Sequence, residues 1–200
     1  MTALKPSRIV ALAALAGLAS LAACASPPKR INNLCAVFEQ NDGYFTNWRS
    51  SAKAAERKYG IPVSVLMATI RKESGFQHNA RPPRKFYLGF IPGKRASSAY
   101  GFAQAIDGTW DSYRNQSGNY SASRTSFSDA VDFVGWYHNQ TATRFGIAPN
   151  DMTSLYLAYY SGWDAFGKGS WRSNGSLVKY ARETAKTASD YEAQMQACGE

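Results

Sequence analysis

Helical periodicity is the feature that most limits what this chain can fold into. From residue 44 to residue 197, apolar side chains recur at intervals of three and four, which places them on one face of an α-helix. We find no alternation of apolar and polar residues long enough to predict a substantial sheet, and no internal repeat. The sequence therefore predicts one mostly α-helical domain.

Capping residues and helix breakers set the limits of the expected helices. Asp42 is expected to cap the first helix and Gly60 to end it, because aspartate accepts backbone N–H groups and glycine tolerates the left-handed conformation. Residues 75–99, rich in proline and glycine, are expected to be irregular. The expected helices cover 44–59, 62–73, 108–115, a long segment from Ser126 or Ser128, 151–161 and 177–197.

The amino terminus has the composition of an export signal. Lys5 and Arg8 precede Ile9–Ala23, which carries no charge and is shorter than the ~20 residues that cross a bilayer. A positive start, a short apolar run and small residues at its end are typical of a secretory signal peptide. Residues 21–24, Leu-Ala-Ala-Cys, resemble the lipobox of bacterial lipoproteins, which implies cleavage before Cys24 and lipidation of that cysteine.

The expected organisation follows from this signal. We expect a lipoprotein signal peptide at 1–23, a lipidated tether with little to bury at 24–34, and the folded domain at 35–200. In the lipoprotein pattern, Ala25 after the lipidated cysteine implies an anchor in the outer membrane that faces the periplasm. The alternative is a simple cleaved signal in which Cys24 has no role.

The remaining cysteines lie at the two ends of the expected domain. With Cys24 lipidated, Cys35 and Cys198 remain, and an even number in an oxidising compartment predicts a disulfide. Two unpaired buried thiols are the alternative. His78 and His138 are the only histidines, and no ligand spacing joins them to the cysteines, so we expect neither a metal site nor a cofactor.

The net charge narrows the choice of partners. It falls from +9 to +7 when Lys5 and Arg8 leave with the signal peptide. A basic surface suits nucleic acid, anionic lipid or an acidic polymer, or serves solubility alone. Export and the lack of a nucleic-acid-binding motif argue against nucleic acid. We therefore expect a monomer that binds peptidoglycan, whose stem peptides carry carboxylates, and that contacts the membrane through its lipid.

Three short motifs occur in a fixed order: Glu73–Phe76, Ser98–Gln104 and Ala158–Gly162. Together they resemble the soluble lytic transglycosylase domain, a lysozyme-like helical fold whose members have roughly Glu-Ser-x-Phe, Gly-Leu-Met-Gln and Ala-Tyr-Asn-x-Gly. The resemblance covers about Tyr59–Gly167. Each motif alone is weak, but three in the right order are specific.

The resemblance implies roles for individual residues. Glu73 corresponds to the catalytic acid and base, Gln104 to a glutamine that lines the cleft and hydrogen-bonds substrate, and Tyr159 to a tyrosine whose hydroxyl lies near the catalytic carboxyl. From the residues themselves, burial of Glu73 beside aromatic rings would raise its pKa, as a general acid at neutral pH requires. The other residues expected at the substrate are Ser74, Tyr100 and Tyr160.

The chain departs from the family pattern in three places. Phe102-Ala103 replaces Leu-Met, and Tyr160 stands where the family has asparagine. The segment between Glu73 and Gly101 is longer than in the family and is rich in basic and aromatic residues. We hypothesise that this segment overhangs the cleft and contacts glycan or stem peptide; a solvated loop is the alternative.

The implied activity is cleavage of peptidoglycan between N-acetylmuramic acid and N-acetylglucosamine with formation of a 1,6-anhydro sugar. The alternatives are a lysozyme-type hydrolase that activates water with a second carboxylate such as Asp107, and a wall-binding lipoprotein that keeps the fold without catalysis. Asp107 is expected instead to cap the helix that follows it, and Asp164 to lie on the surface or in a turn.

Overall fold

The structure is a computed structural model that describes residues 27–42 and 46–198. The expected signal peptide and the lipidation of Cys24 lie outside the described residues. No helix in the described part is long and apolar enough to span a membrane. The fold is mostly α-helical, as expected. Its elements are α2 (Leu34–Phe38), α3 (Trp48–Tyr59), α4 (Val63–Ser74), β1 (Arg84–Tyr87), β2 (Ile91–Arg95), α5 (Asp107–Ser117), α6 (Phe127–Phe145), α7 (Met152–Ser161), α8 (Trp163–Gly167), the 3₁₀ helix η1 (Ser170–Ser173) and α9 (Gly175–Ala197).

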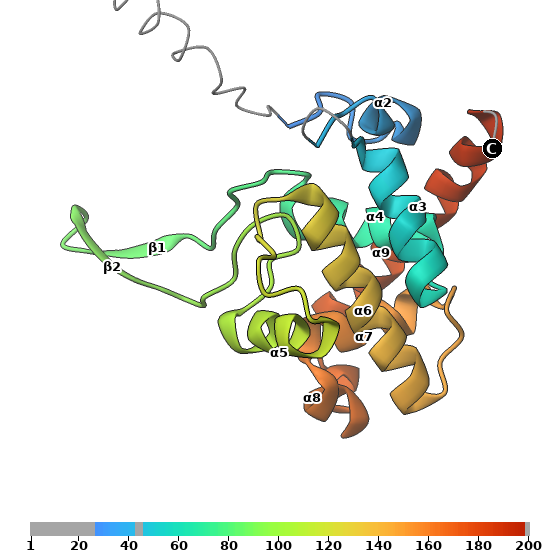
Figure 1. The fold of residues 1–200 in the computed structure, drawn as a ribbon. Coiled ribbons are helices and arrows are strands. Elements are labelled where there is room, and N and C mark those ends of the chain that lie inside the picture. The colour runs from blue at the N-terminus through green and yellow to red at the C-terminus, as the bar shows by residue number, and fades with distance from the viewer. Residues whose placement is uncertain (1–26, 43–45, 199–200) are drawn as a thin grey trace, which may run out of the picture.

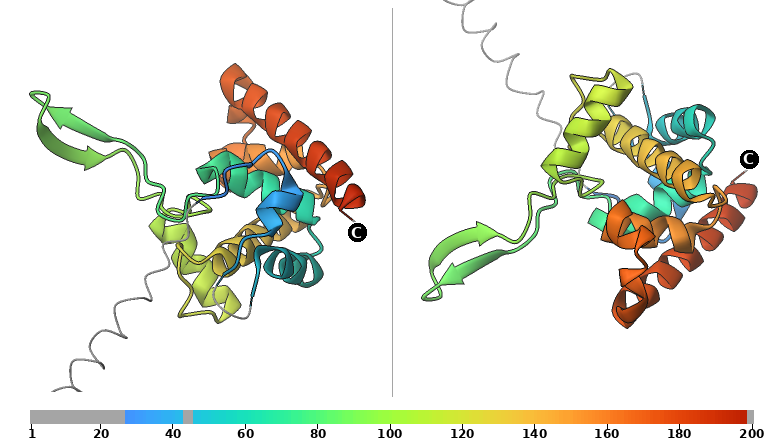
Figure 2. Two further views of the ribbon diagram at one scale, coloured as in Figure 1. Left: turned by 90° about the horizontal axis from the view of Figure 1, so that it is seen from above. Right: turned by 90° about the horizontal axis from the view of Figure 1, so that it is seen from below.

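Helix α4 lies at the centre of the helical body. The residues from Val63 to Ile70 are all buried, so this helix is covered on every side. Helices α3 and α6 pack against one side of α4, and α9 packs against another and also along α7 (Figures 1 and 2). Because α4 is fixed by several neighbours, the residues at its carboxyl end have a fixed position.

Two helix starts differ from the expected ones. Helix α3 begins at Trp48, where Asn47 forms the cap by accepting the backbone N–H of Ser50 at 2.8 Å. The Asp42 carboxylate instead accepts the backbone N–H of Ser128 at 2.7 Å, in the first turn of α6. Asp42 therefore stabilises a helix start 86 residues further along the chain, and its expected role at α3 is wrong.

The sequence also did not predict three short helices or the ordered packing of residues 31–34. Helices α2, α8 and η1 are too short to show a periodic pattern. The chain is already fastened to α9 at Ile31, whose carbonyl accepts the Tyr191 hydroxyl, and the backbone N–H of Leu34 donates to the Gln194 side chain at 2.7 Å. Ordered packing thus starts four residues before the expected boundary at Cys35.

The expected disulfide between Cys35 and Cys198 is present. It joins α2 to the end of α9 across a sequence separation of 163. Since it lies beside the contacts of Ile31 and Leu34 with α9, it locks the two ends of the folded chain together.

A two-stranded antiparallel hairpin interrupts the segment that was expected to be irregular. Strands β1 and β2 pair Arg84 with Arg95 and Tyr87 with Ile91. Leu88 and Gly89 form the turn with positive φ angles of 52° and 80°. The hairpin stands away from the helical body (Figures 1 and 2).

A shared carboxylate ties three helices together. Asp132 on α6 accepts hydroxyl hydrogen bonds from Tyr59 on α3 at 2.9 Å and from Tyr113 on α5 at 2.8 Å. It also pairs with Lys58 at 2.9 Å. Tyr113 is fully buried, so its hydroxyl depends on this carboxylate.

Replacing Asp132 by alanine is expected to lower the free energy of unfolding by about 2–4 kcal/mol, because it leaves tyrosine hydroxyls without their acceptor. Urea unfolding followed by circular dichroism measures the change. The control is Asp190→Ala, which breaks the exposed pair with Lys186 and should cost less than about 1 kcal/mol. Equal losses in the two variants would contradict the role given to Asp132.

Candidate active site

The cleft that contains Glu73 has a volume of about 610 Å³. It lies between the end of α4, the loop that precedes α5, and the carboxyl end of α7, and α6 contributes Phe133 and Tyr137 to its wall. Of the residues expected at the substrate, Glu73, Gln104, Tyr159 and Tyr160 line this cleft together. The structure therefore brings together residues from all three sequence motifs.

Glu73 occupies the last turn of α4, and the turn that follows it is fixed by burial. Gly75 ends the helix with φ +59°, and its N–H donates to the Arg71 carbonyl at 2.9 Å. Phe76 also has a positive φ, an uncommon conformation for a residue with a side chain, and its ring is buried against Trp48 at 5.6 Å. Burial of Phe76 thus holds the chain in the turn that follows Glu73.

The Glu73 carboxyl is withdrawn from water. Its Oε1 is buried and has no hydrogen-bond partner among the described residues. Burial raises the pKa of Glu73 to about 7, although a hydrogen bond from Tyr156 and the charge of Lys72 act in the opposite direction. A carboxyl with this pKa is present in both the protonated and the ionised form at neutral pH. It can therefore both donate and accept a proton.

Gln104 is held by its own side-chain hydrogen bonds. Its backbone has φ +49°, and its Nε2 donates to the carbonyls of Ala80 at 2.9 Å and Gly101 at 2.8 Å. Only glycine fits at position 101, because a Cβ there would lie 2.0 Å from the carbonyl oxygen of Arg124. Since both amide hydrogens are used inside the protein, the Gln104 oxygen is the group that can meet a substrate donor.

Two tyrosines of α7, Tyr156 and Tyr159, lie near the Glu73 carboxyl. The Tyr159 hydroxyl donates to the Ala103 carbonyl at 2.6 Å, and the hydroxyl that hydrogen-bonds Glu73 is that of Tyr156. Burial and, after it, the charge of Glu73 raise the pKa of Tyr159. The effect of that charge shows that Tyr159 lies near the carboxyl. The Tyr160 ring is exposed and forms part of the cleft wall.

Sequence reasoning missed Tyr156 and the wall residue Phe133. Tyr156 precedes Tyr159 by three residues on one helix, so the two side chains share a face, and this spacing was the available signal. Phe133 and Tyr137 are four apart on α6 and share a face for the same reason. Both pairs match the pattern of a helix face that is buried in the core. The sequence pattern therefore does not indicate that these side chains also contribute to the site.

Two other expected substrate residues do not line the cleft. Ser74 is buried and donates its hydroxyl to the Ile70 carbonyl at 3.2 Å. The Tyr100 ring lies under the Arg81 guanidinium at 3.7 Å. Both belong to the motifs in sequence, but their side chains contact other parts of the protein and do not line the cleft.

The family departures have structural counterparts. Phe102 packs into an aromatic cluster with Trp48 and Phe127, at centroid distances of 5.4 and 5.5 Å. Ala103 is buried and its carbonyl accepts the Tyr159 hydroxyl, so the position of the family methionine contributes a backbone group.

The other carboxylates near the motifs have different surroundings from Glu73. Asp107 is the first residue of α5 and forms no cap; it pairs with Arg124 at 2.7 Å, so its expected capping role is wrong. Asp164 is exposed on α8 and lines a hollow that adjoins the cleft.

Residues 84–95 of the basic and aromatic segment do not line the cleft. These residues form the hairpin that stands away from the body (Figure 2), and only the flanking Pro82, Ser97 and Ala99 line the cleft.

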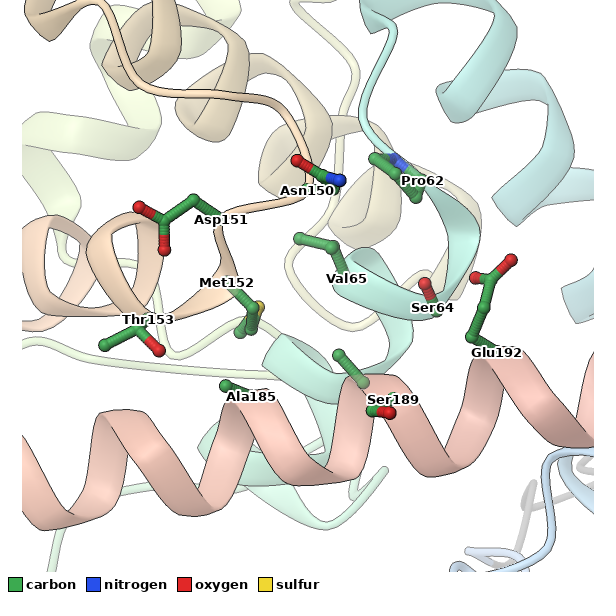
Figure 3. A pocket seen from close by; sticks show the side chains of 11 residues that line it. Pro62, Ser64, Val65, Asn150, Asp151, Met152, Thr153, Ala185, Ser189 and Glu192 are labelled. Carbon is green, nitrogen blue, oxygen red and sulfur yellow. The ribbon is translucent and has the colours of Figure 1, made fainter.

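A second hollow, of about 470 Å³, lies between the start of α4, the start of α7 and α9 (Figure 3). Asp151 and Glu192 lie at its opposite ends, and Asp151 caps α7 by accepting the N–H of Ser154. In the described part of the chain, the buried side-chain atoms without a partner are Glu73 Oε1 and His138 Nδ1. Burial lowers the pKa of His138 to about 3, so of these two buried groups Glu73 is the one that can exchange protons near pH 7.

Comparison with known proteins is consistent with this geometry. No curated protein matches the chain. The model of the transglycosylase SLT domain family matches residues 12–198, which is nearly the whole sequence. The chain therefore belongs to the transglycosylase SLT domain family and shares its mostly α-helical, lysozyme-like fold.

Proposed function

We propose that the protein is a lytic transglycosylase that cleaves peptidoglycan at the β-1,4 bond between N-acetylmuramic acid and N-acetylglucosamine. Membership of the family supports a peptidoglycan-degrading transglycosylase in general. The observation that carries the specific proposal is the buried, unpartnered Oε1 of Glu73 in a cleft, with its pKa raised to about 7.

In the first step, the protonated Glu73 carboxyl donates its proton to the oxygen that bridges the two sugars. The bond from that oxygen to C1 of N-acetylmuramic acid breaks, and N-acetylglucosamine leaves with a free hydroxyl. Positive charge develops at C1, and the N-acetyl group of the substrate helps to stabilise it. General acid catalysis of this kind typically contributes 10²–10⁴-fold.

In the second step, the Glu73 carboxylate removes the proton from the C6 hydroxyl of the same N-acetylmuramic acid. The C6 oxygen forms a bond with C1, which gives the 1,6-anhydro sugar and returns Glu73 to its protonated form. An internal nucleophile has a high effective molarity, so no activated water is required. The same carboxyl serves as acid and then as base.

The number of carboxyl groups that line the cleft favours this internal attack over hydrolysis. Among the described residues that line the cleft, Glu73 supplies the only carboxyl group. A hydrolase of the lysozyme type uses two carboxyl groups that flank the bond. Asp107, the second carboxylate considered for that role, is paired with Arg124 at 2.7 Å and lies outside the cleft lining.

Three neighbours of Glu73 are assigned supporting roles. Gln104, whose amide nitrogen is used internally, offers its oxygen to an N–H or O–H of the glycan. Tyr160, exposed at the cleft wall, offers a ring face or hydroxyl where the family has an asparagine. Tyr159 positions the Gln104 loop through the Ala103 carbonyl.

Digestion of purified sacculi in ¹⁸O-labelled water, with the products analysed by mass spectrometry, tests the reaction type. The proposal expects fragments that end in anhydro-N-acetylmuramic acid, lighter by one water and free of ¹⁸O. Reducing ends that carry ¹⁸O would identify a hydrolase. Binding to sacculi without release of fragments would identify a non-catalytic wall-binding protein.

Replacing Tyr156 by phenylalanine is expected to move the alkaline limb of the pH–rate profile to higher pH. The hydrogen bond from Tyr156 favours the ionised carboxylate, so its loss raises the pKa of Glu73 further, by about 0.7 unit for a bond of roughly 1 kcal/mol. Activity that requires protonated Glu73 then persists to higher pH.

Tyr159→Phe is the matched control for this change, because the Tyr159 hydroxyl bonds to the Ala103 carbonyl and not to the carboxyl. Its alkaline limb should stay at the wild-type position even if turnover falls. Coincident limbs in wild type and Tyr156→Phe would contradict the proposed control of Glu73 by Tyr156.

We also propose that the protein is an exported, monomeric lipoprotein, lipidated at Cys24 and anchored in the outer membrane facing the periplasm. The support is the charge pattern of residues 1–23 and the Leu-Ala-Ala-Cys sequence at 21–24. Cells fed a labelled fatty acid should label the wild type but not Cys24→Ala, and only the wild type should enter the detergent phase in phase partitioning. Equal labelling of the two proteins would exclude this anchor.

A further inference from the structure

The hairpin of β1 and β2 extends away from the helical body (Figures 1 and 2), and the apolar side chains around its turn are exposed to solvent. Leu88 at the turn is 82% exposed and Phe90 73% exposed. Phe86, Tyr87 and Ile91 are exposed as well. An isolated two-stranded hairpin is at best marginally stable in water, and contiguous exposed apolar groups usually mark an interaction site.

Basic side chains follow the apolar tip on both strands. Arg84 and Lys85 lie on β1, and Lys94 and Arg95 lie on β2. The strand register places Arg84 opposite Arg95, an arrangement of like charges that is unfavourable without an anionic partner. None of the four forms an ion pair with another described residue, and residues 74–106 contain no aspartate or glutamate.

We propose that residues 86–91 of the hairpin insert into the headgroup region of an anionic lipid bilayer, with the basic residues of both strands contacting lipid phosphates. Aromatic side chains favour the interface between headgroups and acyl chains, and basic residues near an anionic surface each add to binding. Leu88 and Ile91 favour lipid over glycan, because a polar sugar strand offers aliphatic side chains little apolar surface.

Insertion of the tip fixes how the cleft lies relative to the bilayer. The segments that flank the hairpin include Pro82 and Ser97, which line the cleft that contains Glu73. Strands rise about 3.3 Å per residue, so the turn at Leu88 lies roughly 20 Å from Pro82, measured along the strand. The inserted hairpin holds the cleft at about that distance from the membrane. This inference does not depend on the reaction that the cleft performs.

The test uses the full chain with Cys24→Ala, so that a single added cysteine, Leu88→Cys, carries an environment-sensitive fluorophore. The same fluorophore at Lys179→Cys is the control, since that side chain is exposed and belongs to α9, a helix of the body away from the hairpin (Figure 2). Each protein is mixed with phosphatidylcholine vesicles, with vesicles containing phosphatidylglycerol as well, and with sacculi.

The proposal expects a blue shift and several-fold brighter emission from position 88 on the anionic vesicles, quenched by nitroxide-bearing lipids, and no change at position 179. Adding Lys85→Gln and Lys94→Gln should weaken this response roughly 30-fold in lipid concentration, at about 1 kcal/mol per charge. High salt should weaken it in the same direction.

Three outcomes would overturn the proposal. A label at position 88 that remains in water on anionic vesicles excludes insertion. A response to sacculi alone identifies the cell wall as the partner of the hairpin. Equal responses at positions 88 and 179 show that other parts of the chain bring the whole protein to the lipid.

Discussion

Replacing Glu73 by glutamine is expected to lower turnover on intact sacculi by 10²–10⁴-fold or more while the fold and glycan binding persist. Glutamine has nearly the same shape as protonated glutamate, but it cannot give a proton to the bridging oxygen or take one from the C6 hydroxyl. The loss should appear in kcat, because the carboxyl oxygen that is replaced takes part in breaking the glycosidic bond and not in binding the substrate in its ground state.

The same variant is expected to be more stable than the wild type at neutral and alkaline pH. The pKa of Glu73 is about 7 in the folded protein and near 4.5 in the unfolded chain, so the folded state binds this proton more tightly. The stability that this tighter proton binding gives to the folded state is therefore lost as the pH rises from 4.5 to above 7, by about 3 kcal/mol in total. Glutamine has no such loss.

Glu192→Gln is the matched control, because Glu192 is exposed on α9 and lines the second hollow away from the cleft. It should leave turnover unchanged and should show no comparable gain in stability above pH 7. Turnover near the wild-type level in Glu73→Gln would remove the proposed acid and base from the mechanism.

Replacing both Cys35 and Cys198 by serine is expected to lower the free energy of unfolding by about 3–5 kcal/mol. The bond closes a loop of 163 positions, and the entropy removed from the unfolded chain grows with loop length. For a chain of this size, a loss of this order lowers the melting temperature by about 10–15 °C. The contacts of Ile31 and Leu34 with α9 are expected to open first.

Calorimetry of the oxidised wild type, the reduced wild type and the double serine variant measures this effect. Reduction should lower the melting temperature of the wild type to near that of the variant, and the reductant should not change the variant. A serine variant that melts with the oxidised wild type would contradict a stabilising bond between the two ends.

Local signals predicted most of the helices correctly. The caps of α6 at Ser126 and of α3 at Gly60 follow from capping chemistry that operates within a few residues. The role of Asp42 could not be predicted in this way, because its acceptor atom serves Ser128 across 86 sequence positions. Such a contact depends on how helices pack, which periodicity does not specify.

The hairpin and the surroundings of Glu73 show the same limit. The strands at 84–95 are exposed on both faces for most of their length and include Pro92, so they lack the alternation that marks a half-buried strand. The motifs placed Glu73 and Gln104 together, and the structure confirms that both line the cleft. They pointed to Tyr159, which lies near Glu73, but gave no sign of Tyr156, which shares the same helix face.

Direct titration of the Glu73 carboxyl tests the central claim most closely. The protein is labelled with ¹³C at the glutamate side-chain carboxyls, and the Glu73 resonance is identified by its absence from the spectrum of Glu73→Gln. We expect this resonance to titrate with a midpoint near pH 7, coincident with the alkaline limb of the rate profile. A midpoint near 4.5, the ordinary value for a solvated glutamate, would contradict the buried acid and base on which the mechanism rests.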